Sequence, residues 1–152
     1  MAQTTGQVPK ACGQVEISVD AWVTPVDISG STQSVTGLDQ ARMYDSGYTL
    51  DGDTALIAAG KREPIEAVFS IIYTETAGEA YESARAEFEA DCGDDFYFRY
   101  SPGGGDTGDR ELTSGVGILV SFSYPPIDAT AGGPIIGGFT VAVASLTTAT
   151  HT

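Results

Sequence analysis

Hydrophobic and polar residues alternate with a period of two along most of this chain. Every second position of residues 63–74 is apolar or aromatic: Ile65, Ala67, Phe69, Ile71 and Tyr73. Such alternation places one set of side chains in a core and the other in solvent, as in a half-buried β-strand. On the same grounds we expect strands over residues 14–20, 95–100, 110–124 and 139–143.

The segment 110–124 is long for a single strand, since a typical strand has about five or six residues. One of its faces carries Val116, Ile118, Val120, Phe122 and Tyr124. At about 3.3 Å per residue, the segment would reach on the order of 45 Å. A strand of that length needs a large sheet, so the pattern predicts pairing beyond one subunit.

One segment has helical periodicity. Thr76 and Glu79 have the spacing of a capping box, in which two side chains satisfy free amides of the first helical turn. Apolar residues then recur at helical spacing as far as Phe88, with glutamates on the other side. Gly93 is a suitable stop signal. The sequence therefore predicts one amphipathic helix lying against a sheet.

Turn residues separate the predicted strands. Asp51-Gly52, between residues 48–50 and 54–57, indicates a hairpin because both central residues tolerate positive φ. Seven or eight strands and one helix predict a mainly β fold, namely a β-sandwich or partly open barrel with one flanking α-helix. We expect a single domain over residues 1–152, with flexible or arm-like ends at 1–11 and 149–152.

The net charge of the chain excludes some classes of binding partner. Its 152 residues include 7 Lys and Arg against 21 Asp and Glu, a formal net charge of −14. Affinity for nucleic acid comes mainly from Lys and Arg on phosphates, so a tight nucleic-acid binder is not expected. An anionic membrane surface would repel the chain as well. No apolar run approaches the roughly 20 residues of a transmembrane helix, and the N-terminus lacks a signal-peptide pattern.

The residues that usually carry catalysis or bind metal are sparse. The single histidine, His151, is second from the C-terminus, where a triad imidazole is not easily held. Cys12 and Cys92 form one disulfide or none, and they lack the close ligand spacing of a zinc site. Gly103, Gly105 and Gly108 spell a dinucleotide fingerprint, but strand alternation follows them instead of a helix.

Acidic residues leave two weaker possibilities. Asp45, Asp51 and Asp53 are candidates for a weak calcium site, although the spacing of an EF-hand is absent. Asp94-Asp95 or the helix glutamates would supply the two carboxylates of a glycosidase, but nothing selects a pair. We therefore expect neither an enzyme nor a bound cofactor.

Several short segments together resemble one family. They are 27–32 (DISGST), 40–42 (QAR), 48–57 (YTLDGDTALI), 60–64 (GKREP), 72–75 (IYTE) and 99–104 (RYSPGG). They resemble the tail tube (major tail) proteins of long-tailed, siphovirus-like bacteriophages, and the likeness extends over roughly residues 14–148.

This resemblance implies a structural virion protein. In that family, subunits form hexameric rings that stack into a hollow tail tube, and their strands complete a barrel between subunits. The genome passes through the tube to the host cell without specific binding. The implied partners are other copies of the chain and the tape-measure, tail-terminator and distal tail proteins. The implied location is the virion tail, after assembly in the host cytoplasm. A net charge of −14 suits a wall past which DNA slides, although it also suits plain solubility.

Within this interpretation, the hairpin around Asp51-Gly52 is the candidate for docking one ring on the next. The contact candidates are Tyr44, Asp45, Tyr48, Asp51, Asp53, Lys61 and Arg62. Lys61 and Arg62 would either meet acids of a neighbouring subunit or simply begin the next strand in water.

The face that lines the bore is less clearly marked. The candidates for this face are small or polar residues, which would suit either the lumen or the outer solvent: Thr113, Ser121, Ser123, Thr140, Ala142 and Ala144. Two rival interpretations stay open. One is a monomeric binding or virion-decoration module that uses Tyr97 and Tyr100. The other is the tube of a contractile injection system.

Overall fold

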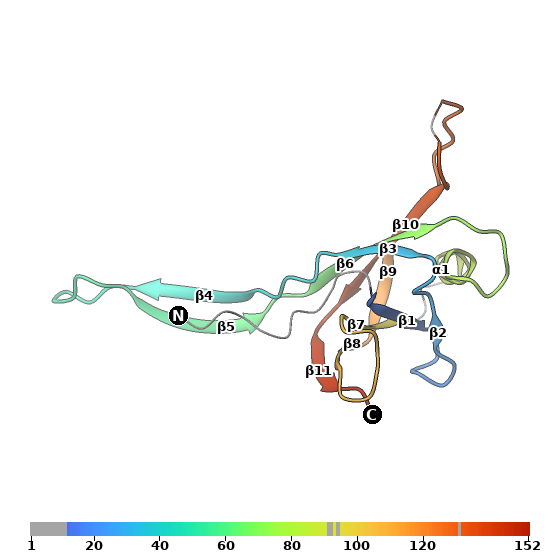
Figure 1. Ribbon diagram of the computed structural model, residues 1–152. Coiled ribbons are helices and arrows are strands. Elements are labelled where there is room, and N and C mark those ends of the chain that lie inside the picture. Colours follow the sequence, from blue (N-terminus) through green and yellow to red (C-terminus); the bar gives the residue numbers. More distant parts are fainter. Residues whose placement is uncertain (1–11, 91–92, 94, 131) are drawn as a thin grey trace, which may run out of the picture.

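The computed structural model describes residues 12–90, 93, 95–130 and 132–152, which form eleven strands and one helix (Figure 1). In chain order, the elements are β1 (Gln14–Ser18), β2 (Val26–Asp27), β3 (Thr32–Thr36), β4 (Arg42–Gly47), β5 (Leu56–Arg62), β6 (Ile65–Ile72), α1 (Ala80–Glu89), β7 (Tyr97–Ser101), β8 (Arg110–Ser114), β9 (Gly117–Ser123), β10 (Ile136–Val143) and β11 (Leu146–Thr150).

The strands form three antiparallel sheets. One has five strands in the order β11-β8-β7-β1-β2, one has four in the order β3-β6-β10-β9, and β4 and β5 form a separate two-stranded sheet. The two larger sheets pack against each other, and α1 lies against β9, β10 and β6. The predicted mainly β sandwich with one helix is confirmed, and none of the described sheets closes into a barrel.

The core lies between the two larger sheets and is rich in aromatic rings. Phe69 of β6 stacks on Phe139 of β10 at 4.7 Å between ring centroids, and meets Phe98 of β7 edge-on at 5.2 Å. The alternation predicted for β6 and β10 is present, because Ile65, Ala67, Phe69 and Ile71 are buried together with Phe139, Val141 and Val143. Aromatic pairs of this kind add to the free energy gained by burying apolar area.

The expected single strand over residues 110–124 is wrong. The chain leaves the five-stranded sheet at Ser114, turns at residues 115–116, and enters the four-stranded sheet as β9. Gly117 lies at this crossing, where an added Cβ would come within 2.5 Å of Val143 and 2.7 Å of the Ala142 carbonyl oxygen. The neighbouring segment from β10 to β11 crosses in the same place, and the Gly115 amide bonds the Ser145 carbonyl at 3.0 Å.

Of the residues predicted to be buried around β9, Phe122 packs against the core and the other four do not. A bulge leaves Val120 without a partner on β10, because Thr140 pairs with Ser121 and Val141 pairs with Leu119. The bulge exchanges the two faces of the strand along its length. Leu119 and Phe122 consequently pack against the core, and the apolar residues expected there are exposed, namely Val116, Ile118, Val120 and Tyr124.

The helix begins later than the capping box predicts. Its N-cap is Glu79, with extended backbone and no side-chain hydrogen bond to the first turn. Gly78 has φ of +87°, in the left-handed region, and this conformation prevents a helix from starting at Thr76. Tyr81 and Ala84 of the helix are buried, whereas Phe88 is exposed and stacks on Phe122 at 5.8 Å.

The first strand ends at Ser18, two residues before the end of the predicted segment 14–20. Val19, expected in the core, is exposed, and Ser18 is buried in its place. The Ser18 hydroxyl donates to Asp20 Oδ1 at 2.8 Å and accepts from the Trp22 amide at 2.9 Å, which turns the chain away from the sheet. Hydrogen bonds from Thr24 and Ser18 lower the pKa of Asp20 to about 2.

The C-terminal residues are held, contrary to the expectation of a loose end. Ala149 and Thr150 belong to β11, and the His151 amide donates to the Asp109 carbonyl at 2.8 Å. His151 Nδ1 lies 2.9 Å from Glu111 Oε2, and Glu111 is near Arg99, which contacts Glu16. This row of charges runs over the outer face of the five-stranded sheet.

The remaining sequence candidates for chemistry are dispersed. Residues 1–11, Cys92 and Asp94 lie outside the described residues, and Cys12 is an exposed free thiol. Gly103, Gly105 and Gly108 lie in the loop between β7 and β8, so a strand follows them. Among the described residues, no helix is long and apolar enough to cross a lipid bilayer.

We expect Gly117→Ala to destabilise the subunit by about 1–3 kcal/mol, because the new methyl group overpacks the crossing between the sheets. Urea unfolding followed by circular dichroism measures the change. Gly47→Ala in β4 is the matched control, since its added Cβ meets nothing within 4 Å; its effect should stay within about 0.5 kcal/mol. Equal effects of the two substitutions would contradict the tight crossing.

The pKa of Glu111 lies below its ordinary value, mainly because it accepts a hydrogen bond from His151. This contact stabilises the fold above the ordinary glutamate pKa, and its contribution is lost as pH falls through the lowered value. His151→Ala should therefore raise the pKa of Glu111 toward its ordinary value, as followed by carboxyl NMR. An unchanged pKa would show that Arg99 and Thr113 suffice to lower it.

Candidate assembly surfaces

The two-stranded sheet of β4 and β5 extends away from the body of the molecule (Figure 1). We call residues 42–62 the arm, residues 48–55 its tip, and the end near Arg42 and Arg62 its root. Every residue of β4 and β5 is exposed, including Tyr44 and Ile57, each with 72% of its surface accessible. The arm therefore contributes nothing to the core of its own subunit.

The hairpin predicted around Asp51-Gly52 is present, but it is built differently from the prediction. Pairing from Tyr44–Ala59 to Gly47–Leu56 is symmetric about Asp51-Gly52. The strands nevertheless end at Gly47 and Leu56, which leaves the eight-residue tip unpaired. Neither Asp51 nor Gly52 has positive φ, so the expected two-residue turn does not form.

Both faces of the arm carry apolar side chains. Directly paired residues share a face, so Tyr44 lies with Ala59 and Ser46 with Ile57. The opposite face carries Leu56, paired with Gly47, and Ala58, paired with Asp45. Met43, Tyr48 and Leu50 are also exposed. A lone two-stranded hairpin is at best marginally stable in water, and its exposed apolar residues mark an interaction surface.

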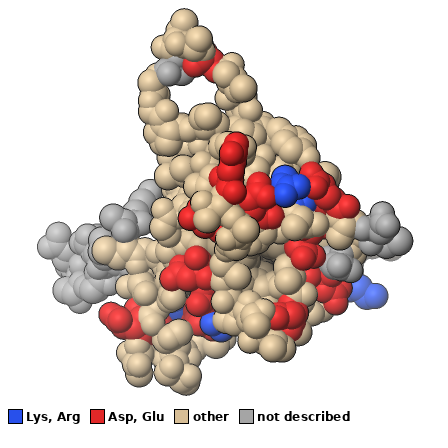
Figure 2. Space-filling model, turned by 90° about the vertical axis from the view of Figure 1, so that its right-hand side faces the viewer, with Lys and Arg blue, Asp and Glu red and all other residues tan. Residues whose placement is uncertain are grey.

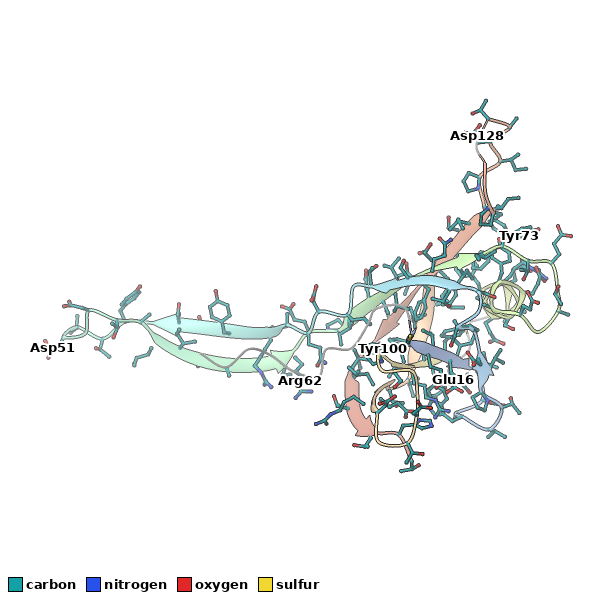
Figure 3. The ribbon with its side chains drawn as sticks, in the orientation of Figure 1. Glu16, Asp51, Arg62, Tyr73, Tyr100 and Asp128 are labelled. Atoms are coloured by element: carbon teal, nitrogen blue, oxygen red, sulfur yellow. The ribbon has the colours of Figure 1, made fainter. Side chains whose placement is uncertain are left out.

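The contact candidates identified in the sequence all lie on the arm, but they do not form one cluster. Tyr44 and Asp45 are in β4, Lys61 and Arg62 are at the end of β5, and Tyr48, Asp51 and Asp53 are in the tip. Figure 3 shows Asp51 at the far end and Arg62 near the body. Within the described part of the chain, no group of acidic, cysteine or histidine residues could hold a metal ion, so the three aspartates are not gathered into a calcium site.

Sequence reasoning missed Arg42, which completes the charge of the arm root. A bulge between Arg42 and Tyr44 shifts the register, and Arg42 therefore pairs directly with Arg62. The Arg42 guanidinium donates to the Gly60 carbonyl at 2.9 Å. Three of the seven Lys and Arg residues of the chain thus lie at the arm root: Arg42, Lys61 and Arg62.

A second surface is the outer face of the four-stranded sheet, which is almost free of charge. Register and alternation place these residues on it: Ser34, Thr36, Glu66, Val68, Ser70, Ile72, Ile118, Ser121, Ser123, Ile136, Gly138, Thr140 and Ala142. Glu66 is the one charged residue among them. Four of the predicted lumen candidates meet here: Ser121, Ser123, Thr140 and Ala142. Thr113 lies in the other sheet, and Ala144 follows β10.

The acidic residues lie elsewhere. The outer face of the five-stranded sheet carries Glu16, Arg99 and Glu111. At the end of the body remote from the arm, Asp and Glu are spread over the surface and outnumber Lys and Arg (Figure 2). A chain with a net charge of −14 therefore leaves one sheet face nearly neutral. Against such an acidic background, this uncharged face is a candidate interaction surface.

The four-stranded sheet has two edges, β3 and β9. Among the described residues, the outer edge of β9 is bridged only at Gly117, which exchanges backbone hydrogen bonds with Phe96. The backbone groups beyond this bridge are available to another strand. Such edges are templates for pairing with a second chain.

The surface required by the rival binding module is not assembled. Tyr97 and Tyr100 are three residues apart on β7 and so point to opposite faces of the sheet. Tyr97 lies near Trp22, with ring centroids 6.1 Å apart, and Tyr100 packs against the core.

Comparison with solved structures shows a fold shared with tail-like particles. The chain is similar to a component of the 6-fold symmetrised anti-feeding prophage baseplate, with a TM-score of 0.79, 11% identity and coverage of 97% of this chain and 98% of that one. The sheath-tube complex of an extracellular contractile injection system (PVC) gives 0.74 at 12% identity, covering 95% and 92%. The tail of an empty GTA particle with C6 symmetry gives 0.64 at 12%, covering 97% and 100%. No protein-family model and no curated protein matches the sequence.

In the isolated protein, the amide hydrogens of β4 and β5 should exchange with solvent much faster than those of β6 and β10, because in the described part of the chain no other strand pairs with the arm. Hydrogen–deuterium exchange with mass spectrometry on the subunit tests this. Protection of the arm equal to that of β6 in a monodisperse monomer would contradict its isolation.

Proposed function

We propose that this protein is a structural component of a phage-tail-like particle, whose copies form rings that stack into a hollow tube. The observation that carries the proposal is the four-stranded sheet with its edge strands β3 and β9, joined to an arm that pairs with no other strand among the described residues. Pairing of β9 in one copy with β3 in the next would join the sheets around a ring. The 6-fold and C6 symmetry of the related particles supports six copies per ring.

In this ring, the outer face of the four-stranded sheet lines the bore. The wall consists of Ser, Thr, Ala and Gly residues together with the aliphatic Val68, Ile72, Ile118 and Ile136, and it offers few attachment points to charged cargo. Lys and Arg are absent from this face, so phosphates would find no counter-charge. The wall is less acidic than the net charge suggests, because Glu66 is its one carboxylate.

In the same assembly, the arm docks one ring on the next. Its apolar residues on both faces require cover on both sides, which a stack of rings provides. The tube would also meet the tape-measure, terminator and distal tail proteins at its ends, and it would belong to the particle and act without catalysis.

Two of the related structures are named as parts of an extracellular contractile injection system, namely its sheath-tube complex and its sheath/tube terminator, with TM-scores of 0.74 and 0.76. This similarity supports a tube inside a contractile particle in place of the long-tailed phage tube implied by the sequence segments.

A second candidate function is a terminal ring, since the related structures include a tube-terminating cap and a sheath/tube terminator. A terminal protein would form single rings that do not stack on themselves.

Negative-stain microscopy of the purified protein tests the proposal. We expect hollow tubes built from stacked rings. Single rings at all concentrations would favour the terminal role. A monodisperse monomer by light scattering at every concentration would overturn the proposal and favour the binding module.

Deletion of residues 46–53 should abolish stacking, because it removes most of the tip and part of the strand pairing of the arm. The body should keep its thermal midpoint within a few degrees, since none of the deleted residues is buried. Normal tubes from the deleted chain would show that the arm does not dock rings.

A further inference from the structure

The arm carries opposite charges at its two ends. At the root, Arg42 and Arg62 are direct cross-strand partners. Like charges directly opposite each other on a two-stranded sheet are destabilising. At the tip, Asp51 and Asp53 are exposed carboxylates, with the apolar side chain of Leu50 beside them.

The root arginines differ from Arg85 and Arg99, which are both paired with carboxylates. Arg85 pairs with Glu82 and Glu89, each at 2.6 Å, and Arg99 pairs with Glu16. Within the described part of the chain, neither Arg42 nor Arg62 forms an ion pair.

The nearest acids in the sequence do not neutralise the root. Asp39 and Glu63 flank the arm, yet neither forms an ion pair with Arg42 or Arg62 in the described structure. The positive charge of the root is therefore unbalanced in the single subunit, in a chain where acidic residues outnumber basic ones three to one.

The tip cannot reach the root of its own arm. About nine residues of extended chain separate Asp51 from Arg42, a span of about 30 Å, and Figure 3 shows the tip and the root at opposite ends. An acidic tip and a basic root on one rigid element can meet only between two copies of the chain.

We propose that Asp51 and Asp53 of one copy bind Arg42 and Arg62 of the next, so that successive arms run head to tail. This inference rests on the proposed function and names the partner of the arm. Glu82, Glu89 and Glu16 are already engaged by Arg85 and Arg99, whereas Asp51 and Asp53 form no ion pair among the described residues.

The apolar residues of the arm fit the same contact. Tyr44 and Ile57 lie on the face that carries the Arg42–Arg62 pair, and both are exposed. Leu50 of an incoming tip would cover them while its neighbouring aspartates reach the guanidinium groups. Such a contact joins two different surfaces, so it propagates from copy to copy until it closes a ring or extends a filament.

Charge exchange tests this contact in the full-length chain. Arg42→Glu with Arg62→Glu, and separately Asp51→Arg with Asp53→Arg, should each raise the protein concentration needed for assembly by at least about ten-fold. A chain with all four substitutions restores opposite charges across the contact. It should assemble within about three-fold of the original concentration, as measured by light scattering and microscopy.

Arg110→Glu is the control, because Arg110 is an exposed arginine of β8, away from the arm. It changes net charge without touching the contact and should leave assembly unaffected. Assembly of the original chain should also weaken as salt is raised, since salt screens exposed charges.

The outcomes separate this inference from the proposed function. If the original chain forms tubes and the quadruple variant assembles as poorly as either double variant, the tip does not bind the root, although the proposed tube is retained. If either double variant assembles like the original chain, the proposed contact is likewise wrong. If the original chain never assembles, the proposed function itself fails and the inference with it.

Discussion

Backbone hydrogen bonding constrains this molecule more than any side-chain chemistry. Each strand carries amide and carbonyl groups that are stable only when paired or solvated. Central strands such as β6 and β10 are paired on both sides, whereas β3 and β9 are edges, and within the described residues β4 and β5 pair only with each other. The backbone hydrogen bonds of the described strands are therefore complete at the centre of the four-stranded sheet and incomplete along its edges.

The two larger sheets depend on one crossing point. The passage from β8 to β9 and the passage from β10 to β11 lie side by side, and Gly117 fits where a side chain would collide with Val143. Both passages switch sheets at this point: β8 and β11 belong to the five-stranded sheet with the charged outer face, and β9 and β10 belong to the four-stranded sheet with the nearly neutral outer face. The two segments therefore connect the two differently charged faces of the sandwich.

The sequence predicts the strands in which the alternation of apolar and polar residues matches the burial of their side chains. β6 and β10 alternate without interruption, and their buried sets are those predicted. The break at residues 115–116 was invisible because alternation continues across it, and the bulge at Val120 inverted the predicted burial. The contact candidates lie on the predicted hairpin, but Arg42 is not among them. A hairpin symmetric about Asp51-Gly52 would pair Arg42 with Lys61. The bulge at the root instead pairs it with Arg62, and this register is not visible in the sequence.

The arm and the neutral sheet share one stretch of backbone. β5 (Leu56–Arg62) runs into β6 (Ile65–Ile72), with only Glu63 and Pro64 between them. β6 is paired with β10 along its whole length and with β3 over residues 68–71. The arm therefore continues directly into a central strand of the body, and a force on the tip would be carried by the backbone into the four-stranded sheet.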